Sequence, residues 1–301
     1  MTLTACAPLN RVKAPPLNVD ISRSELRPAT YRELPLYSGQ LVLSESGGPV
    51  SLLFSLFVEQ FSPYVHAGVL VFENGEPIVY EARGRVQLET GTVPTDTIEG
   101  RIRARHLGKL LRRQNYVSIY NPPPGTNIDA MVRYVREQYR ARLPFDPYFN
   151  TGDHSEVYCT EFLALALEAG GVPLPAATAI RKNPSLAVVR DWLKLASDSL
   201  YLAESMVSPD NRAMTLSRKH SIKHVRLYQA AKAELHRRFS ADQKLGNVFS
   251  WSRGSLQYRP EIRTFLARAV DLQVQEEDVT EVHAQEAVTR LARSMFGAYP
   301  M

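Results

Sequence analysis

Tyr158-Cys159-Thr160-Glu161-Phe162-Leu163-Ala164-Leu165-Ala166-Leu167 predicts a helix that begins at a cysteine. Apolar residues occupy nearly every side of this helix, so we expect it to run through the hydrophobic core. The glycine pair Gly170-Gly171 is a suitable C-terminal stop. A thiol in the first turn lies at the positive end of the helix dipole, which favours the thiolate. The stretch therefore predicts a buried helix that carries a cysteine nucleophile at its N-terminus.

A second stretch, residues 66–82, predicts a β-hairpin that carries a candidate base for this thiol. His66 begins an apolar strand, Asn74-Gly75 is a strong signal for a two-residue turn, and Glu81 lies on the return strand. With that turn, residue 68 faces residue 81. Glu81 then lies diagonal to His66 on the same face, with Gly68 leaving the space between them empty. A slip of one residue would place Glu81 on the opposite face, so the prediction depends on this register.

Papain-type chemistry needs a thiol, an imidazole that takes its proton, and a polar group that holds the imidazole. Cys159, His66 and Glu81 are the candidate catalytic residues. Each has an ordinary alternative when it is taken alone: a core cysteine, a strand histidine and a surface charge. A cysteine at a helix tip, a strand histidine and a glutamate on the same face form one arrangement, and together they favour the catalytic interpretation.

Five short motifs between residues 39 and 162 carry a resemblance to a known family. The motifs are Gly39-Gln40-Leu41, Val65-His66-Ala67-Gly68-Val69, Val79-Tyr80-Glu81-Ala82, Arg142-Leu143-Pro144-Phe145-Asp146-Pro147-Tyr148-Phe149 and Tyr158-Cys159-Thr160-Glu161-Phe162. Their order, with the histidine before the cysteine, resembles the circularly permuted papain-like cysteine amidases of the YaeF/YiiX type, which are relatives of the NlpC family. The resemblance covers less than half of the chain and leaves residues 208–301 unexplained.

The resemblance implies an α+β fold with a permuted papain-like (NlpC-like) core, in which a small antiparallel sheet packs on helices. It also implies a thiol-dependent amidase or peptidase. The sequence departs from the family at Gln40, which replaces an acidic residue, and at Val65, which replaces a serine. Phe145 replaces a tyrosine that lies near the thiol in relatives, so we expect another group to help the Cys159 N–H bind the oxyanion or substrate. The candidates are Tyr158, Tyr148 and Tyr64.

The composition divides the chain into three parts. Residues 1–35 are rich in proline and charge and have no sustained period, which is typical of a tether. Residues 36–205 contain all five motifs and predict the catalytic domain. Residues 206–301 predict three helices, as a small helical domain or as a helical layer packed on the first domain.

The chain of 301 residues is 44% hydrophobic with a net charge of +5, which suits a globular protein with a sizeable core. Its longest apolar run, Leu52–Val58, is broken by Ser55 and is too short to span a bilayer. No nucleic-acid motif is present, so we expect no nucleic-acid partner. Two cysteines without a paired Cys or His spacing argue against a zinc site, and we expect no metal and no cofactor.

Residues 99–113 are strongly basic. The basic side chains are Arg101, Arg103, Arg105, His106, Lys109, Arg112 and Arg113. A solvated helix face is the simpler interpretation and the favoured one. The alternative is a patch that binds lipid headgroups or an anionic substrate.

Leu3-Thr4-Ala5-Cys6 fits the bacterial lipobox, in which a small residue precedes a lipidated cysteine. The charged and apolar regions of a signal peptide are missing upstream, unless Met1 is an internal methionine of a longer signal. We favour a lipoprotein that faces the periplasm and associates with the membrane through a lipid on Cys6. A chance match in a cytoplasmic protein is the alternative. A disulfide between Cys6 and Cys159 is a less well supported alternative, and lipidation of Cys6 would exclude it.

The predicted activity is hydrolysis of an amide or ester bond in a peptide or acyl-lipid substrate of the cell envelope. The apolar segment 51–61 either lines an acyl pocket or belongs to the core. Two alternatives remain open. The same site serves a lipid-directed acyl hydrolase or acyltransferase, or the scaffold is a non-catalytic module that binds an envelope partner.

Overall fold

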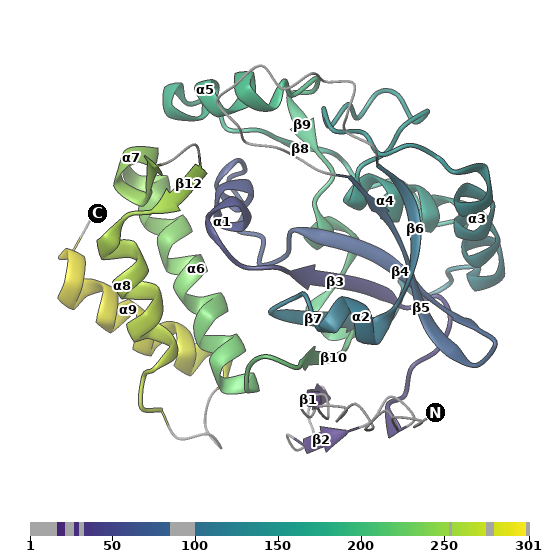
Figure 1. Ribbon diagram of the computed structural model, residues 1–301, viewed down its shortest axis with the longest axis horizontal. Helices are drawn as coiled ribbons and strands as arrows, with labels where there is room; N and C mark the ends of the chain where they lie inside the picture. The colour runs from purple at the N-terminus through teal and green to yellow at the C-terminus, as the bar shows by residue number, and fades with distance from the viewer. Residues whose placement is uncertain are drawn as a thin grey trace, which may run out of the picture.

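A computed structural model of the chain describes residues 17–21, 27–29, 33–84, 100–252, 255–274 and 280–298. The fold is α+β, as the sequence predicts. One eight-stranded sheet forms the centre, and helices pack on it and beside it (Figure 1). None of the helices in these ranges is both long and apolar enough to cross a bilayer.

The central sheet has the strand order β2-β1-β10-β7-β3-β4-β5-β6, and every pair of neighbours is antiparallel. Its strands are β1 (Leu17–Ile21), β2 (Arg27–Ala29), β3 (Leu41–Glu45), β4 (His66–Glu73), β5 (Glu76–Arg83), β6 (Arg101–His106), β7 (Tyr116–Tyr120) and β10 (Arg212–Ser217). Two small sheets consist of β8 (Thr178–Ala179) with β9 (Ser199–Leu200), and β11 (Phe249–Ser252) with β12 (Ser255–Tyr258).

Helices pack against both faces of the sheet because its side chains alternate between two hydrophobic clusters. The helices are α1 (Pro49–Leu56), α2 (Leu107–Leu111), α3 (Ile128–Ala141), α4 (Cys159–Ala169), α5 (Pro184–Leu193), α6 (Ile222–Asp242), α7 (Leu245–Val248), α8 (Pro260–Val270) and α9 (Glu281–Phe296). Leu41 and Leu43 of β3 belong to the larger cluster, together with residues of α3 and α4. Val42 belongs to the smaller cluster, with residues of α2 such as Leu110.

The cysteine helix α4 has the form that the sequence predicts. Cys159 is its first residue, and the six residues 162–167 are buried. The N–H of Gly170 bonds to the carbonyl of Ala166, and Gly171 follows with a φ of 84°, so the glycine pair ends the helix. Because most of its residues are apolar, α4 lies in the core between α3 and strand β4 (Figure 1).

The hairpin of β4 and β5 has the register that the sequence predicts. Glu73 pairs with Glu76 across a two-residue turn, in which Asn74 and Gly75 both have positive φ. A Cβ on Gly68 would lie 2.6 Å from the carbonyl oxygen of Tyr80, so glycine permits the close approach of the two strands. This register places His66 and Glu81 in contact, and the prediction is confirmed.

The basic segment differs from its favoured interpretation. Residues 101–106 form strand β6, which pairs with β5, and the helix α2 covers only Leu107–Leu111. A helix face is therefore wrong for the first half of the segment. The physical reason is the open edge of β5, which offers backbone partners to a chain in which buried Ile102 alternates with charged side chains.

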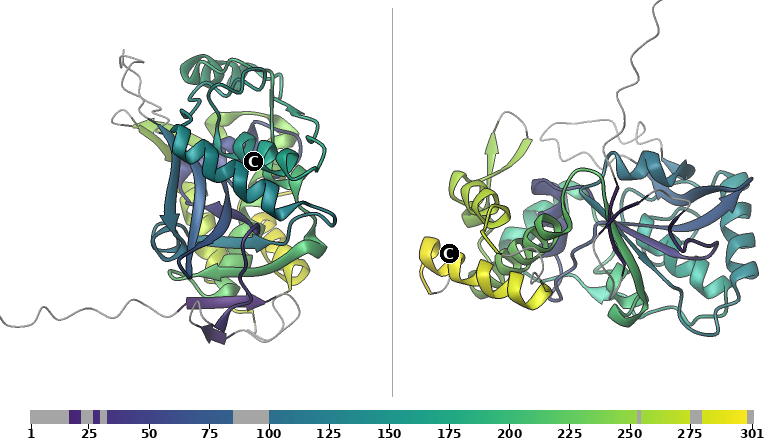
Figure 2. Two further views of the ribbon diagram at one scale, coloured as in Figure 1. Left: turned by 90° about the vertical axis from the view of Figure 1, so that its right-hand side faces the viewer. Right: turned by 90° about the horizontal axis from the view of Figure 1, so that it is seen from below.

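The two ends of the chain also take part in the central sheet. Strand β1 lies in the range 1–35 that the sequence assigns to a tether, and it pairs with β10 from the range 206–301. Helix α6 packs on α1, α8 and α9. The C-terminal helices α6, α8 and α9 lie beside the sheet at the end opposite α3 (Figure 2). The described part of 206–301 therefore continues the sheet and core instead of adding only helices. Cys6 lies outside the described residues.

A buried ion pair fixes α6 to the sheet. Lys232 Nζ of α6 lies 3.0 Å from Glu45 Oε2 of β3 and 2.8 Å from Ser51 Oγ of α1, and the side chains of the ion pair are fully buried. Glu45 also accepts hydrogen bonds from Ser51 Oγ and from the N–H of Gly47. A buried charge needs such partners because the loss of water is costly.

Candidate active site

The structure brings Cys159, His66 and Glu81 together at one end of the sheet. His66 Nε2 lies 2.6 Å from Glu81 Oε2 across the two hairpin strands. The Cys159 thiol interacts with the His66 side chain and raises the pKa of its ring, and Cys159 Sγ lies 3.9 Å from the carbonyl oxygen of Val65. Because Nε2 faces the carboxylate, Nδ1 is the ring nitrogen left for the thiol. Each group has a partner of the kind that thiol chemistry requires.

The imidazole is held in its charged form. Burial lowers the pKa of His66, but the Glu81 carboxylate and hydrogen bonds to Cys159 and Glu81 outweigh burial and raise that pKa to about 10. Burial alone would raise the pKa of Glu81. The charges and hydrogen bonds of His66 and Arg105 outweigh burial and lower that pKa to about 2. At neutral pH the pair is therefore an imidazolium bound to a carboxylate.

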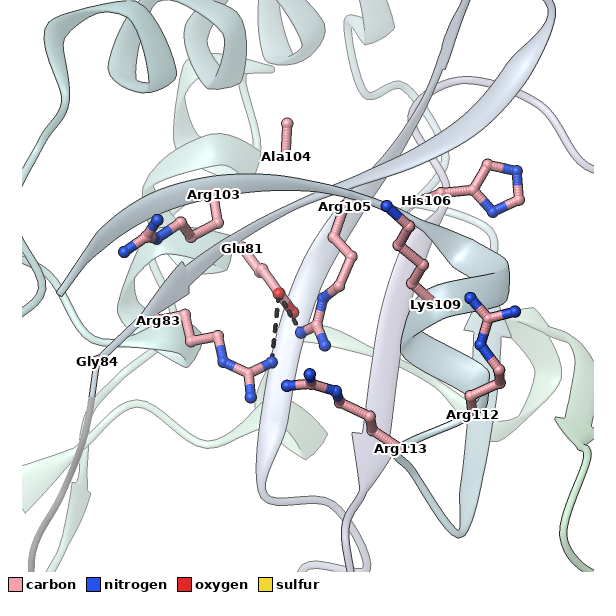
Figure 3. Close-up of a pocket in the computed structure, with 10 residues that line it drawn as sticks. All are labelled: Glu81, Arg83, Gly84, Arg103, Ala104, Arg105, His106, Lys109, Arg112 and Arg113. Atoms are coloured by element: carbon pink, nitrogen blue, oxygen red, sulfur yellow. Dashed lines mark hydrogen bonds and ion pairs between the residues drawn. The ribbon is translucent and has the colours of Figure 1, made fainter. Parts of the chain in front are cut away.

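Two arginines hold the far side of the Glu81 carboxylate (Figure 3). Arg105 of β6 donates to Glu81 Oε1, and Arg83 Nη1 lies 3.8 Å from the same oxygen. Glu81 itself is fully buried. The sequence places Arg105 in a basic surface segment, and this role was missed. Its alternation with Arg101 and Arg103 beside a strand that carries a buried glutamate is the signal that would have revealed it.

The Glu81→Gln substitution tests this electrostatic coupling. Without the carboxylate, burial dominates, so we expect the titration midpoint of His66 to fall from about 10 to well below it. Histidine side-chain chemical shifts measured against pH by NMR report the midpoint. Glu76→Gln is the matched control, because Glu76 lies on the same strand and its exposed carboxylate pairs with the half-buried His106 and not with His66. An unchanged His66 midpoint in Glu81→Gln would contradict the coupling.

The loop before α4 brings aromatic side chains to the thiol. Asp146 accepts hydrogen bonds from the N–H groups of Tyr148, at 2.7 Å, and of Asn150. This turn directs Phe145 and Phe149 into a cavity beside Cys159. The ring of Phe149 also packs on Tyr158, with 5.0 Å between ring centroids.

The first turn of α4 is fixed by a glutamate. Glu161 Oε1 lies 2.8 Å from His154 Nδ1, and its Oε2 accepts a hydrogen bond from the N–H of Tyr158. Burial raises the pKa of Glu161 to about 7, although the His154 and Tyr158 hydrogen bonds oppose the shift. The carboxyl thus joins the residue before Cys159 to the helix, which holds the thiol in place.

The cavity above the thiol is mostly apolar and has a volume of about 200 Å³. Cys159 and His66 both line it. The apolar lining residues include Phe54, Val58, Ala82, Phe145, Phe149, Leu200, Leu202 and Ala203, and the polar ones include Ser55, Ser62, Arg83, Thr160 and Tyr201. Segment 51–61 contributes to the core, and Phe54, Ser55 and Val58 of this segment also line the cavity.

The three tyrosines expected near the thiol have different positions. Tyr64 and Tyr158 line the cavity, whereas Tyr148 is not among its lining residues. Their hydroxyls are already engaged: Tyr64 bonds to the hydroxyl of Tyr120 at 2.8 Å, and Tyr158 accepts from the N–H of Tyr201 at 2.9 Å. The N–H groups of the first helical turn, including that of Cys159, have no partner within the helix and suit an oxyanion better.

Within the described ranges, no three His, Cys, Asp or Glu side chains are grouped so that they could hold a metal ion.

Comparison with known proteins gave a similarity in structure and none in sequence. No protein-family profile and no curated protein sequence matches the chain. Among solved structures, the chain is similar to the metalloprotein YiiX from Escherichia coli O157:H7, with a TM-score of 0.45 and 16% identity. The alignment covers 62% of this chain and 98% of that one.

Proposed function

We propose that the protein is a thiol-dependent hydrolase of amide or ester bonds, with a permuted papain-like site of Cys159, His66 and Glu81. The observation that carries the proposal is the contact of the Cys159 thiol with an imidazole that Glu81 holds at 2.6 Å, at the wall of an open cavity. A cysteine with a purely structural role would not be expected to contact the His66–Glu81 pair and also line a cavity.

In the proposed reaction the Cys159 thiolate attacks the carbonyl carbon of the substrate. The positive end of α4 and the His66 imidazolium favour this thiolate. The N–H of Cys159 receives the oxyanion, and His66 gives its proton to the leaving amine or alcohol. A water molecule then loses a proton to His66 and attacks the thioester, which releases the acid and restores the thiol. Glu81 keeps the imidazole oriented and stabilises its cation throughout.

The lining of the cavity favours an acyl chain as the group that enters it. Aromatic and aliphatic side chains form most of the wall, and such a surface binds apolar groups. Acyl amides and esters of lipids therefore fit the site better than charged peptides, which supports the lipid-directed alternative, as a hydrolase or as an acyltransferase. A purely binding module is less well supported, because the thiol is open to the cavity. An envelope location and a lipid on Cys6 remain predictions.

Alkylation of the thiol tests the proposal directly. In a Cys6→Ser background, where Cys159 is the remaining cysteine, we expect iodoacetamide to label Cys159 at least about tenfold faster than glutathione at pH 7. The His66→Gln variant in the same background should lose this advantage. Intact mass spectrometry over time gives both rates. Labelling of Cys159 no faster than glutathione would refute an activated nucleophile.

A further inference from the structure

A second cavity lies on the outer side of the hairpin, next to the Glu81 carboxylate (Figure 3). Its volume is about 560 Å³, within the range of roughly 300–1,000 Å³ that is usual for small-molecule sites. We call it the basic pocket. It is lined by Glu81, Arg83, Gly84, Arg103, Ala104, Arg105, His106, Lys109, Arg112 and Arg113.

Cations dominate the lining. Six arginine and lysine side chains surround one carboxylate, which is fully buried and already bound to His66. Within the described ranges, four of the cations form no ion pair with a carboxylate: Arg103, Lys109, Arg112 and Arg113. Nη1 of Arg105 is buried and has no hydrogen-bond partner among the described residues. The basic pocket therefore has a large excess of positive charge that the described part of the protein does not neutralise.

The fold forces these charges together. Arg103 pairs with Glu81 across the sheet and Arg101 pairs with Arg83, so every second residue of β6 adds a cation to the same face. Helix α2 follows β6 directly and brings Lys109, with Arg112 and Arg113 just after it. Figure 3 shows the guanidinium groups of Arg83, Arg105 and Arg113 pointing toward a common centre.

The crowding has an electrostatic cost. Burial, followed by the charges of Arg105, Arg113 and Arg103, lowers the pKa of Arg83, and Glu81 opposes the shift. Like charges this close destabilise one another when no anion lies between them. An anionic ligand would relieve the repulsion.

We propose that the basic pocket binds a ligand that carries two or more phosphate groups. Five of the six cations are arginines, whose planar forks bind phosphate oxygens in pairs. The number of cations exceeds what one phosphate needs, and the volume has room for several. No Phe, Tyr or Trp is among the lining residues, so the basic pocket lacks the stacking surfaces that single-stranded nucleic acids use.

The basic pocket adjoins the candidate active site without depending on its chemistry. Arg83 and Gly84 line both cavities, and Arg105 links the basic pocket to Glu81. Anion binding needs no thiol, so a Cys159→Ala variant should bind the ligand as the wild type does. This variant separates the inference from the proposed hydrolase: loss of activity with retained binding leaves the anion site intact.

Isothermal titration with sodium tripolyphosphate tests the proposal. We expect the wild type to bind it and the Arg112→Gln/Arg113→Gln variant to bind at least about tenfold more weakly, because both exposed side chains line the basic pocket and the substitutions remove two guanidinium groups that would bind phosphate oxygens. Arg133→Gln/Arg263→Gln is the matched control, since it removes two exposed arginines from α3 and α8. Equal weakening in both variants would overturn the proposal, and so would the absence of tripolyphosphate binding to the wild type together with no sedimentation that depends on the basic pocket in the vesicle experiment below.

Two sources of such phosphates are separated by a vesicle experiment. Phosphatidylcholine vesicles with and without phosphatidylinositol bisphosphate are sedimented with the wild type and with both double variants. Sedimentation that requires the phosphorylated lipid and the intact basic pocket identifies a lipid headgroup as the ligand. Tripolyphosphate binding without sedimentation identifies a soluble polyphosphate. Both results support the proposal, and sedimentation by all three proteins without tripolyphosphate binding contradicts it.

Discussion

Cys159→Ser should lower kcat/KM on acyl p-nitrophenyl esters by at least about 10³-fold, because the reaction loses its nucleophile while the rest of the site stays in place. Serine fills the same space, but its hydroxyl is a far weaker acid than a thiol, and the His66 imidazolium cannot take its proton. The activity that remains would come from the oxyanion site and from binding alone.

The substrate series adds a second readout. Esters with acyl chains of increasing length, assayed with the wild type, should show a preference for chains that fill the apolar cavity beside Cys159. Cys6→Ser is the control, because it removes a thiol that lies outside the candidate site in the sequence, and its activity should equal that of the wild type. Equal rates for Cys159→Ser and Cys6→Ser would contradict the nucleophile assignment.

Lys232→Met should destabilise the protein by about 3–5 kcal/mol, because it leaves the Glu45 carboxylate buried without its counter-ion. Methionine retains most of the volume of lysine, so the packing of α6 is conserved and the charge is the main change. Urea unfolding followed by circular dichroism measures the loss as a lower midpoint.

Two further variants separate charge from packing. Glu45→Gln/Lys232→Met removes both charges and should recover most of the stability, because no unpaired charge remains. Lys223→Met is the matched control on the same helix, where lysine is partly exposed, and it should change the free energy of unfolding by no more than about 0.5 kcal/mol. If Lys232→Met matches this control, the buried pair does not stabilise the fold.

The parts of the site that could be predicted from the sequence follow from local rules. Asn74-Gly75 sets the turn, the turn sets the register, and the register brings Glu81 to His66. The position of Cys159 at the start of a largely apolar helix likewise depends on neighbouring residues alone. Local rules act over a few residues, and for that reason the hairpin and α4 were predicted correctly.

The parts that could not be predicted depend on contacts between distant segments. The sequence of strand β10 carries no local signal for its partner, and its place beside β7 depends on residues about a hundred positions away. The pairing of Arg105 with Glu81 requires β6 to pair with β5. The charges of residues 101–106 led us to predict a helix face there instead of a strand. Charge pattern alone does not distinguish a solvated helix from an edge strand that carries its charges on one face.

The ion pair between Glu45 and Lys232 constrains the order in which the chain matures on the ribosome. The two residues are 187 positions apart, so at about 5–20 residues per second Lys232 is synthesised roughly 10–40 s after Glu45. During that interval the Glu45 carboxylate has no Lys232 counter-ion, and the edge of β7 has no β10 to pair with. The hairpin with His66 and the helix with Cys159 emerge within this period. The thiol and imidazole are therefore made before the core that surrounds them can close.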